Sequence, residues 1–180
     1  MTEGKTKYNV YLGRFCPLHK GHEAIINSIV EKHGKENLLI MIGSSTSHNK
    51  RTPYTYEERA KMIRMIYPDA KIVGLPDSEP NKIFFREHTI NEWLKSIKEV
   101  ESEMNGEFKF FGGSVEDLSD LSKEFDTEVI VDRNEGPEKI SATKVREAFE
   151  SGDIKKAKSM ISESTYSLVA PKSDETLRKV

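Results

Sequence analysis

Five short apolar runs alternate along this 180-residue chain with longer segments in which apolar residues recur at helical spacing. Most of the runs end at glycine or proline, and the second is apolar almost throughout. Continuous apolar runs of this length are typical of strands buried on both faces of a parallel sheet. The runs are Tyr8–Leu12, Asn37–Gly43, Ala70–Leu75, Phe108–Phe111 and Glu128–Val131. The alternation predicts an α/β fold, a Rossmann-like, doubly wound parallel five-stranded sheet with helices on both faces.

Helices are expected between these runs. Thr55 and Glu58 have the spacing of a capping box, which predicts a helix start, and Pro68 predicts the end of that helix. Residues 115–125 are expected to form one helix after the fourth strand. Further helices are expected after Pro17 and over residues 89–100, 140–152 and 154–161.

The composition is that of a charge-rich folded protein. Charged residues make up 32% and hydrophobic residues 36% of the chain, and the strand-like runs are too apolar for a disordered protein. No apolar run approaches the length of a membrane span and the N-terminus lacks a signal-peptide apolar segment, so we expect no membrane partner. The single cysteine, Cys16, allows no internal disulfide and fits the reducing cytoplasm. A formal net charge of −2 argues against nucleic acid as a partner.

One domain is expected over residues 1–161. The tail, residues 162–180, is rich in serine, threonine and charge, so we expect it to be disordered or to be ordered only as a contact in a homo-oligomer. Residues 78–88 are expected to form a loop longer than most connections in α/β units, which indicates a functional or a mobile segment.

The candidate site residues directly follow the predicted strands. Ligands of a doubly wound sheet bind beyond the carboxyl ends of its strands, so we expect these segments to gather at one edge. They are Gly13–His22, the loop from Ser44, Pro76–Asp77, Gly112–Gly113 and Asp132–Arg133.

The first of these segments joins a strand to a helix through a turn that contains Gly13 and Pro17. His19 and His22 share one face of the helix start because they are three positions apart, and Gly21 leaves room for a phosphate to approach the backbone. Main-chain N–H groups and the helix dipole make such a start an anion site. A pair of solvent-exposed histidines and a zinc pair are the alternatives, but no cysteine cluster or carboxylate at ligand spacing supports zinc.

The segment from Gly13 to His22 resembles the signature of the nucleotidyltransferase superfamily. This superfamily includes the nicotinamide mononucleotide adenylyltransferases, pantetheine-phosphate adenylyltransferase and the cytidylyltransferases. Residues Ile140–Arg146 resemble its second signature, and the resemblance extends over about residues 8–150. The chain is most similar to the archaeal-type nicotinamide mononucleotide adenylyltransferases. That similarity is carried by Gly13–Phe15, Gly43–Ser44, Ser47–His48, Arg51–Thr55, Glu58–Arg59 and Leu75–Asp77.

The resemblance implies a set of site residues. The catalytic residues it implies are His19, His22, Arg14 and Arg51. The nucleotide-binding residues it implies are Gly13, Phe15, Gly21, Ser141, Thr143 and Arg146. The acceptor-binding residues it implies are Ser44, Asp77 and Trp93. A core position for Trp93 and solvated helix faces for Arg59 and Arg146 are the alternatives, and Ser141 also fits a plain helix cap.

The implied reaction is transfer of AMP from ATP, with Mg²⁺ bound to it, to nicotinamide mononucleotide, giving NAD and pyrophosphate. The acceptor phosphate is already ionised at neutral pH because its second pKa is about 6. Attack on the α-phosphorus therefore needs positioning and charge neutralisation rather than a general base. Four alternatives stay open: another phosphate acceptor such as nicotinate mononucleotide or phosphopantetheine, CTP in place of ATP, a nucleotide-binding regulator without turnover, and a fragment related to aminoacyl-tRNA synthetases.

Overall fold

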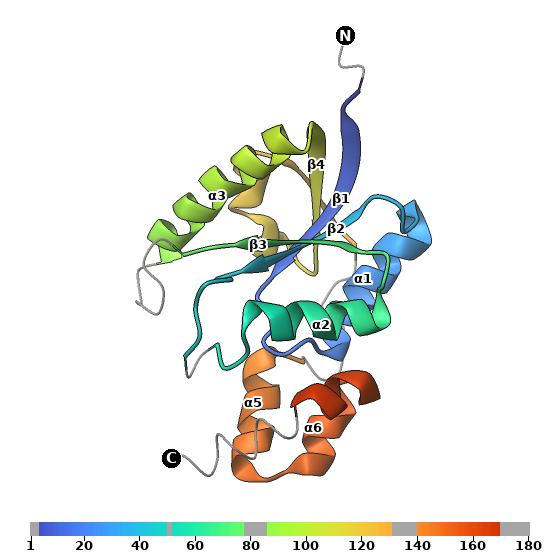
Figure 1. The fold of residues 1–180 in the computed structure, drawn as a ribbon, viewed down its shortest axis with the longest axis vertical. Coiled ribbons are helices and arrows are strands. Elements are labelled where there is room, and N and C mark those ends of the chain that lie inside the picture. Colours follow the sequence, from blue (N-terminus) through green and yellow to red (C-terminus); the bar gives the residue numbers. More distant parts are fainter. Residues whose placement is uncertain (1–3, 50–51, 78–85, 131–139, 170–180) are drawn as a thin grey trace.

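The computed structural model describes residues 4–49, 52–77, 86–130 and 140–169, with side chains from residue 89 onward in the third range. Its centre is a five-stranded, wholly parallel sheet in the order β3-β2-β1-β4-β5 (Figure 1). The strands are β1 Thr6–Gly13, β2 Leu38–Gly43, β3 Lys71–Leu75, β4 Gly106–Gly112 and β5 Asp126–Val129. The predicted fold class is confirmed, and the order of the strands reverses between β1 and β4, which is the topological switch point of this fold.

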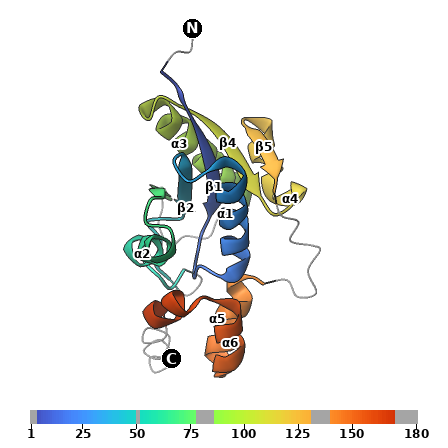
Figure 2. The ribbon, with the colours of Figure 1, turned by 90° about the vertical axis from the view of Figure 1, so that its right-hand side faces the viewer.

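Helices connect the strands and cover both faces of the sheet (Figure 2). They are α1 Lys20–His33, α2 Tyr56–Ile66, α3 Arg86–Glu103, α4 Val115–Leu118, the 3₁₀ turn η1 Leu121–Lys123, α5 Ala142–Ser151 and α6 Ile154–Met160. The capping box predicted for α2 is confirmed, because the side chains of Thr55 and Glu58 each accept the other's main-chain N–H. None of the helices in the described ranges is long and apolar enough to cross a membrane.

An apolar cluster lies on each face of the sheet. Val10 faces one cluster and Tyr11 the other, since successive side chains of a strand point to opposite faces. Helices α1, α2, α5 and α6 contribute to the cluster of Tyr11, and α3 and α4 to the cluster of Val10. All six residues of β2 are buried, as expected for a strand covered on both faces.

Helices α5 and α6 extend the molecule beyond the end of the sheet toward which β1 runs (Figures 1 and 2). The start of α5 therefore lies at the carboxyl edge of the strands, near the start of α1. The main-chain oxygen of Ile140 lies 3.7 Å from the point that a Cβ on Gly21 would occupy. The fold thus brings together two segments that are more than a hundred residues apart in the sequence.

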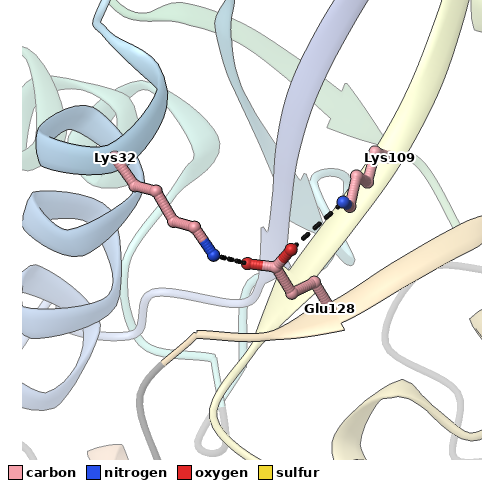
Figure 3. A network of polar contacts seen from close by, with 3 residues as sticks. All are labelled: Lys32, Lys109 and Glu128. Carbon is pink, nitrogen blue, oxygen red and sulfur yellow. Dashed lines mark hydrogen bonds and ion pairs between the residues drawn. The ribbon is translucent and has the colours of Figure 1, made fainter.

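The edge strand β5 is held to its neighbours by one carboxylate. Glu128 accepts from Nζ of Lys32 on α1 at 2.9 Å and from Nζ of Lys109 on β4 at 3.1 Å (Figure 3). The hydrogen bond from Lys32 is the main reason that the pKa of Glu128 lies below its usual value. This network fixes β5 against both α1 and β4.

The single helix predicted for residues 115–125 is wrong, because the segment divides into α4 and η1. The hydroxyl of Ser119 donates to the main-chain oxygen of Glu116, and that of Ser122 donates to the oxygen of Ser119, each at 2.9 Å. Such local bonds to carbonyl groups compete with a continuous helix ladder. The predicted strand at residues 128–131 begins two residues earlier, at Asp126, and its last expected residue lies outside the described ranges.

The first part of the expected tail packs against the domain within a single copy of the chain. Residues 163–169 are helical, and Thr165 and Val169 are fully buried. The ring of Tyr166 stacks on that of Phe149 of α5 with 6.2 Å between centroids. The apolar core therefore continues past residue 161 to Val169.

Candidate active site

The turn between β1 and α1 brings both predicted histidines to the carboxyl edge of the sheet. Phe15 adopts a φ of +53°, in the left-handed region that residues with a side chain disfavour. Its ring is buried edge-on against Tyr11, at 5.5 Å between centroids, and lies 4.7 Å from the ring of His22. The side chain of Phe15 thus packs against His22. Phe15 could therefore contact a nucleotide only through its main-chain atoms.

His19 and His22 cap the same helix reciprocally. His19 is the N-cap of α1, and its Nδ1 accepts the main-chain N–H of Gly21 at 3.1 Å and of His22 at 3.3 Å. Nδ1 of His22 accepts the main-chain N–H of His19 at 3.2 Å. Because both Nδ1 atoms are acceptors, the neutral rings carry their protons on Nε2. The rings stack at 3.6 Å between centroids, so two Nε2–H donors lie side by side at the start of the helix.

Gly21 makes room for the ring of His19. A Cβ at this position would lie 2.8 Å from Cε1 and 2.9 Å from Nδ1 of His19, closer than such atoms approach. The predicted need for a glycine here therefore has a local cause, because the cap would be displaced by any side chain. The predicted approach of a phosphate to this backbone stays a prediction.

The start of α5 is fastened to the turn that carries the histidines. Ser141 is the N-cap of α5, and its Oγ accepts the N–H of Lys144 at 3.2 Å. Arg146 donates from Nη1 to the main-chain oxygen of Cys16 at 2.8 Å and from Nη2 to Oγ1 of Thr143 at 3.3 Å. The second predicted segment therefore contacts the first directly, through a side chain that is half-buried rather than fully solvated.

A cavity of about 510 Å³ opens beside this turn, between the end of β1 and helices α3 and α4. Gly13, Arg14 and His22 line one side of it, and Trp93 lines another. The remaining lining residues are Tyr11, Leu12, Thr89, Ile90, Leu94, Ile97, Phe111, Gly112, Asp117, Leu118, Asp120 and Leu121. The cavity lies at the switch point of the sheet, where ligands of this fold bind.

Trp93 is both a core residue and part of the cavity wall. It is 8% exposed and belongs to the apolar cluster of α3, and a Cβ on Gly43 would lie 2.5 Å from its ring. Its Nε1 donates to Oδ1 of Asp77 at 3.3 Å, while Oδ2 of Asp77 accepts from Ser47 at 2.8 Å. The guanidinium of Arg14 lies 5.8 Å from the ring centroid, within the range of a cation–π contact. The structure thus joins three predicted site residues, Arg14, Asp77 and Trp93, through one indole.

Arg59 is fully buried, so its alternative position on a solvated helix face is wrong. Its guanidinium donates to the main-chain oxygens of Arg14 at 3.1 Å, Gly43 at 2.9 Å and Ser44 at 3.0 Å, and its Nε donates to the oxygen of Thr55 at 3.3 Å. Burial is the main cause that lowers the pKa of Arg59. Ser44, predicted to bind the acceptor, is itself buried with a φ of +51°.

Some predicted segments lie wholly or partly outside the described ranges. Of the loop expected over residues 78–88, residues 86–88 belong instead to helix α3 and the rest lie outside these ranges, as does the expected strand-end segment Asp132–Arg133. Arg51, the expected partner of Arg14 in binding phosphates, lies outside the described residues.

Cys16 lies in the turn but is only 1% exposed, and burial raises the pKa of its thiol. Asp117 and Asp120 line the cavity although no motif marked them, because that wall forms only when α4 folds against β4 and η1 against β5. Within the described ranges, no group of three or more His, Cys, Asp or Glu side chains could hold a metal ion.

Comparison with known protein families gives one match that covers most of the chain. The family model described as Cytidylyltransferase-like matches residues 10–148. The match begins in β1 and ends in α5, so it contains both segments that the fold brings together.

Curated relatives extend this similarity. A nicotinamide-nucleotide adenylyltransferase of Methanocorpusculum labreanum is 38% identical over 80 residues, which are 42% of this chain and 46% of that protein. The chain thus matches less than half of that relative's length. A nicotinamide-nucleotide adenylyltransferase of Thermococcus sibiricus is 28% identical over 172 residues, which are 91% of this chain and 78% of that protein.

Solved structures share the fold at lower identity. A bifunctional NMN adenylyltransferase/ADP ribose pyrophosphatase of Francisella tularensis, complexed with AMP and a manganese ion, aligns with a TM-score of 0.64 and 21% identity over 96% of this chain and 52% of that chain. A nicotinic acid mononucleotide adenylyltransferase of Plasmodium falciparum, complexed with NaAD, aligns with a TM-score of 0.61 and 17% identity over 92% of this chain and 95% of that chain. At these identities the likeness concerns the fold alone.

Proposed function

Because the chain belongs to the cytidylyltransferase-like family, we propose that it transfers AMP from ATP to nicotinamide mononucleotide, with NAD and pyrophosphate as products. The observation that carries this proposal is the pair of Nε2–H donors of His19 and His22 beside the capped start of α5. The adenylyltransferase names of the Methanocorpusculum and Thermococcus relatives support ATP and this acceptor.

The reaction is an in-line displacement. An oxygen of the acceptor phosphate forms a bond to the α-phosphorus of ATP, the bond from that phosphorus to the oxygen bridging to the β-phosphate breaks, and pyrophosphate leaves with the electron pair. His19 and His22 donate from Nε2 to the α-phosphate oxygens, where negative charge concentrates in the transition state. Neither histidine acts as a base, because each Nδ1 is already an acceptor in a helix cap and the attacking phosphate is already ionised.

Helix α5 holds the leaving group. Its ten residues begin at Ala142, directly after the N-cap Ser141, and the N-terminus of a helix of this length favours anions through its N–H groups and dipole. Arg146 lies one turn into the helix and is held by the oxygen of Cys16, so its guanidinium is oriented before a nucleotide arrives. Ser141, Thr143 and Arg146 therefore bind the β- and γ-phosphates in this proposal.

A divalent ion enters with the nucleotide. In this proposal the ion would be held by phosphate oxygens of ATP and by water. When bound, Mg²⁺ supplies neutralisation of charge on the bridging phosphates.

The acceptor binds in the cavity beside Trp93. Arg14 is the positively charged side chain among the described lining residues, and its fork suits the phosphate of the mononucleotide. Asp117 and Asp120 bring two carboxylates to the same cavity. The two carboxylates favour nicotinamide mononucleotide, whose pyridinium ring carries a neutral amide. They repel nicotinate mononucleotide, whose ring carries an additional carboxylate. The charge of the cavity therefore supports the amide as the acceptor.

The test is pyrophosphate release from Mg-ATP or Mg-CTP with a panel of acceptors: nicotinamide mononucleotide, nicotinate mononucleotide and phosphopantetheine. We expect release with ATP and nicotinamide mononucleotide, and loss of turnover by about 10²–10³-fold in His22→Ala, as for one lost transition-state donor. Release with none of the acceptors despite ATP binding would favour a regulator. A wild-type rate in His22→Ala would exclude the assigned role of His22.

The choice between the two mononucleotides has its own test. The ratio of kcat/KM for nicotinamide over nicotinate mononucleotide should fall about fivefold or more in Asp117→Asn/Asp120→Asn, since fivefold corresponds to about 1 kcal/mol of lost discrimination. Glu116→Gln is the matched control, because Glu116 is exposed on the same helix and does not line the cavity. A ratio within twofold of the wild type would show that these carboxylates do not select the acceptor.

A further inference from the structure

The turns that follow β1 and β2 share an unusual backbone feature. Phe15, after β1, has a φ of +53° and Ser44, after β2, has a φ of +51°, both in the left-handed region. Neither residue is glycine, so both conformations are disfavoured for the isolated backbone and require support from surrounding structure. Both turns lie at the carboxyl edge of neighbouring strands, where the proposed nucleotide site is built.

One buried side chain contacts both turns. Arg59 enters from α2, and Nη1 donates both to the oxygen of Arg14 in the first turn and to the oxygen of Gly43 at the second. Nη2 donates to the oxygen of Ser44. The planar guanidinium thus binds the carbonyl group that precedes each left-handed residue and also the carbonyl group of Ser44 itself, which the single nitrogen of lysine could not reproduce.

These bonds also orient the opposite sides of the same peptides. In a planar trans peptide the C=O and N–H groups point in opposite directions. When the oxygens of Arg14 and Gly43 turn inward to Arg59, the N–H groups of Phe15 and Ser44 turn away from it. Arg59 therefore selects one of the two peptide orientations at each strand end.

Arg59 also brings a positive charge to a buried position. Its hydrogen bonds within the described structure go to main-chain oxygens, which do not neutralise a guanidinium as a carboxylate would. Burial opposes this charge, as the lowered pKa indicates, and Asp77 and Glu57 are the carboxylates that act on it from a distance. A phosphate bound at the strand ends would compensate the charge further.

We infer that Arg59 is a positioning residue of the nucleotide site: its buried guanidinium fixes the two strand-end turns in their left-handed form and adds positive charge beneath the bound phosphates. This inference rests on the proposed function. It distinguishes Arg59 from Arg14 and Arg146, which are half-buried or line the cavity and act on the ligand directly.

Two substitutions separate the charge from the fork. Arg59→Gln removes the charge and most donors, and we expect it to weaken equilibrium binding of Mg-ATP and of inorganic tripolyphosphate about tenfold or more, as for loss of a charge-assisted contact. Arg59→Lys keeps the charge, so its affinity for tripolyphosphate should stay within about threefold of wild type. Its kcat should fall about tenfold or more, because lysine cannot donate to the carbonyl groups of both turns at once and the turns are no longer held in place.

Two controls separate positioning from stability. Ile63→Ala shortens a buried side chain of the same helix that carries no charge and no hydrogen-bonding group, so it should lower Tm and leave ligand binding unchanged. Arg64→Gln removes an exposed charge from α2 and should change neither. Binding is measured by calorimetry well below the Tm of each variant.

The outcomes are separable. Failure of the wild type to bind Mg-ATP would contradict the proposed function, whereas wild-type affinity and kcat in both Arg59 variants, with only Tm lowered, would overturn the inference alone. If Arg59→Gln does not fold, Arg59→Lys carries the test. If neither folds while Ile63→Ala does, Arg59 serves stability only and the inference is also overturned.

Discussion

Replacement of His19 separates its two roles, since the same ring caps α1 through Nδ1 and offers a donor through Nε2. Asparagine is among the best N-cap residues, and alanine is among the poorest. His19→Asn therefore keeps the cap but lacks the Nε2 donor, and His19→Ala lacks both. We expect the two variants to differ in stability but to be equally impaired in turnover.

The magnitudes follow from the contacts of His19. Its Nδ1 accepts two main-chain N–H groups, those of Gly21 and His22, which only a capping side chain would satisfy. Loss of such a cap costs about 1 kcal/mol, so His19→Ala should melt about 2–4 °C below His19→Asn for a domain of this size. Both variants also lose the buried ring, so that contribution cancels in the comparison. Loss of one transition-state donor should lower kcat of both by about 10²–10³-fold.

The assay pairs thermal unfolding by circular dichroism with pyrophosphate release at a temperature where both variants are folded. Recovery of wild-type turnover by His19→Asn would refute the reasoning, because it would assign the function of His19 to the cap alone. Equal melting temperatures of the two variants would refute the assigned cap. A helix-face control is Glu31→Gln, which changes an exposed residue of α1 far from the cap.

Three further results are expected. Gly43→Ala brings a Cβ to 2.5 Å from the ring of Trp93, so the free energy of unfolding in urea should fall by about 1–3 kcal/mol, and an unchanged value would contradict the packing. Cys16 is buried with a raised pKa, so native protein should react slowly with a thiol reagent and urea-unfolded protein rapidly; equal rates would contradict its burial. The pKa of Glu128 is lowered in the folded state, so its contribution to stability is present above the unfolded pKa of about 4.3 and is lost as pH falls through the lower folded value. Urea titrations should therefore show Glu128→Gln less stable than wild type by up to about 1 kcal/mol at pH 7 and equal to it at low pH, and a difference that persists in acid would contradict the assignment.

The sequence predicted the features that depend on local patterns. Each of the five apolar runs overlaps a strand, and the prediction is clearest for β2, because burial on both faces of a parallel sheet leaves no polar alternation. The edge strand β5 is partly exposed and begins two residues earlier than its run. The spacing of Thr55 and Glu58 predicted the cap of α2, because a capping box is formed within four residues. The gathering of strand-end segments at one edge follows from the connectivity of α/β units, whereas the order of the strands was not predicted.

Features that depend on contacts between residues far apart in the sequence were harder to predict from it. Arg59 shares a helix face with Met62, Ile63 and Ile66, and this spacing was a signal that it points inward. The carbonyl groups that make its burial favourable come from two turns far away in the sequence, so no local pattern identifies them. The cavity likewise has walls from β1, α3 and α4, whose relative positions the sequence does not specify.

Isotopic labelling follows the α-phosphate of ATP, which the proposed reaction transfers, as AMP, to nicotinamide mononucleotide. The protein is incubated with Mg²⁺, nicotinamide mononucleotide and ATP labelled with ³²P at either the α- or the γ-phosphate, and the products are separated by chromatography. We expect α-label in NAD and γ-label in pyrophosphate. Label from the γ-phosphate in the acceptor, or no label in a dinucleotide, would contradict it.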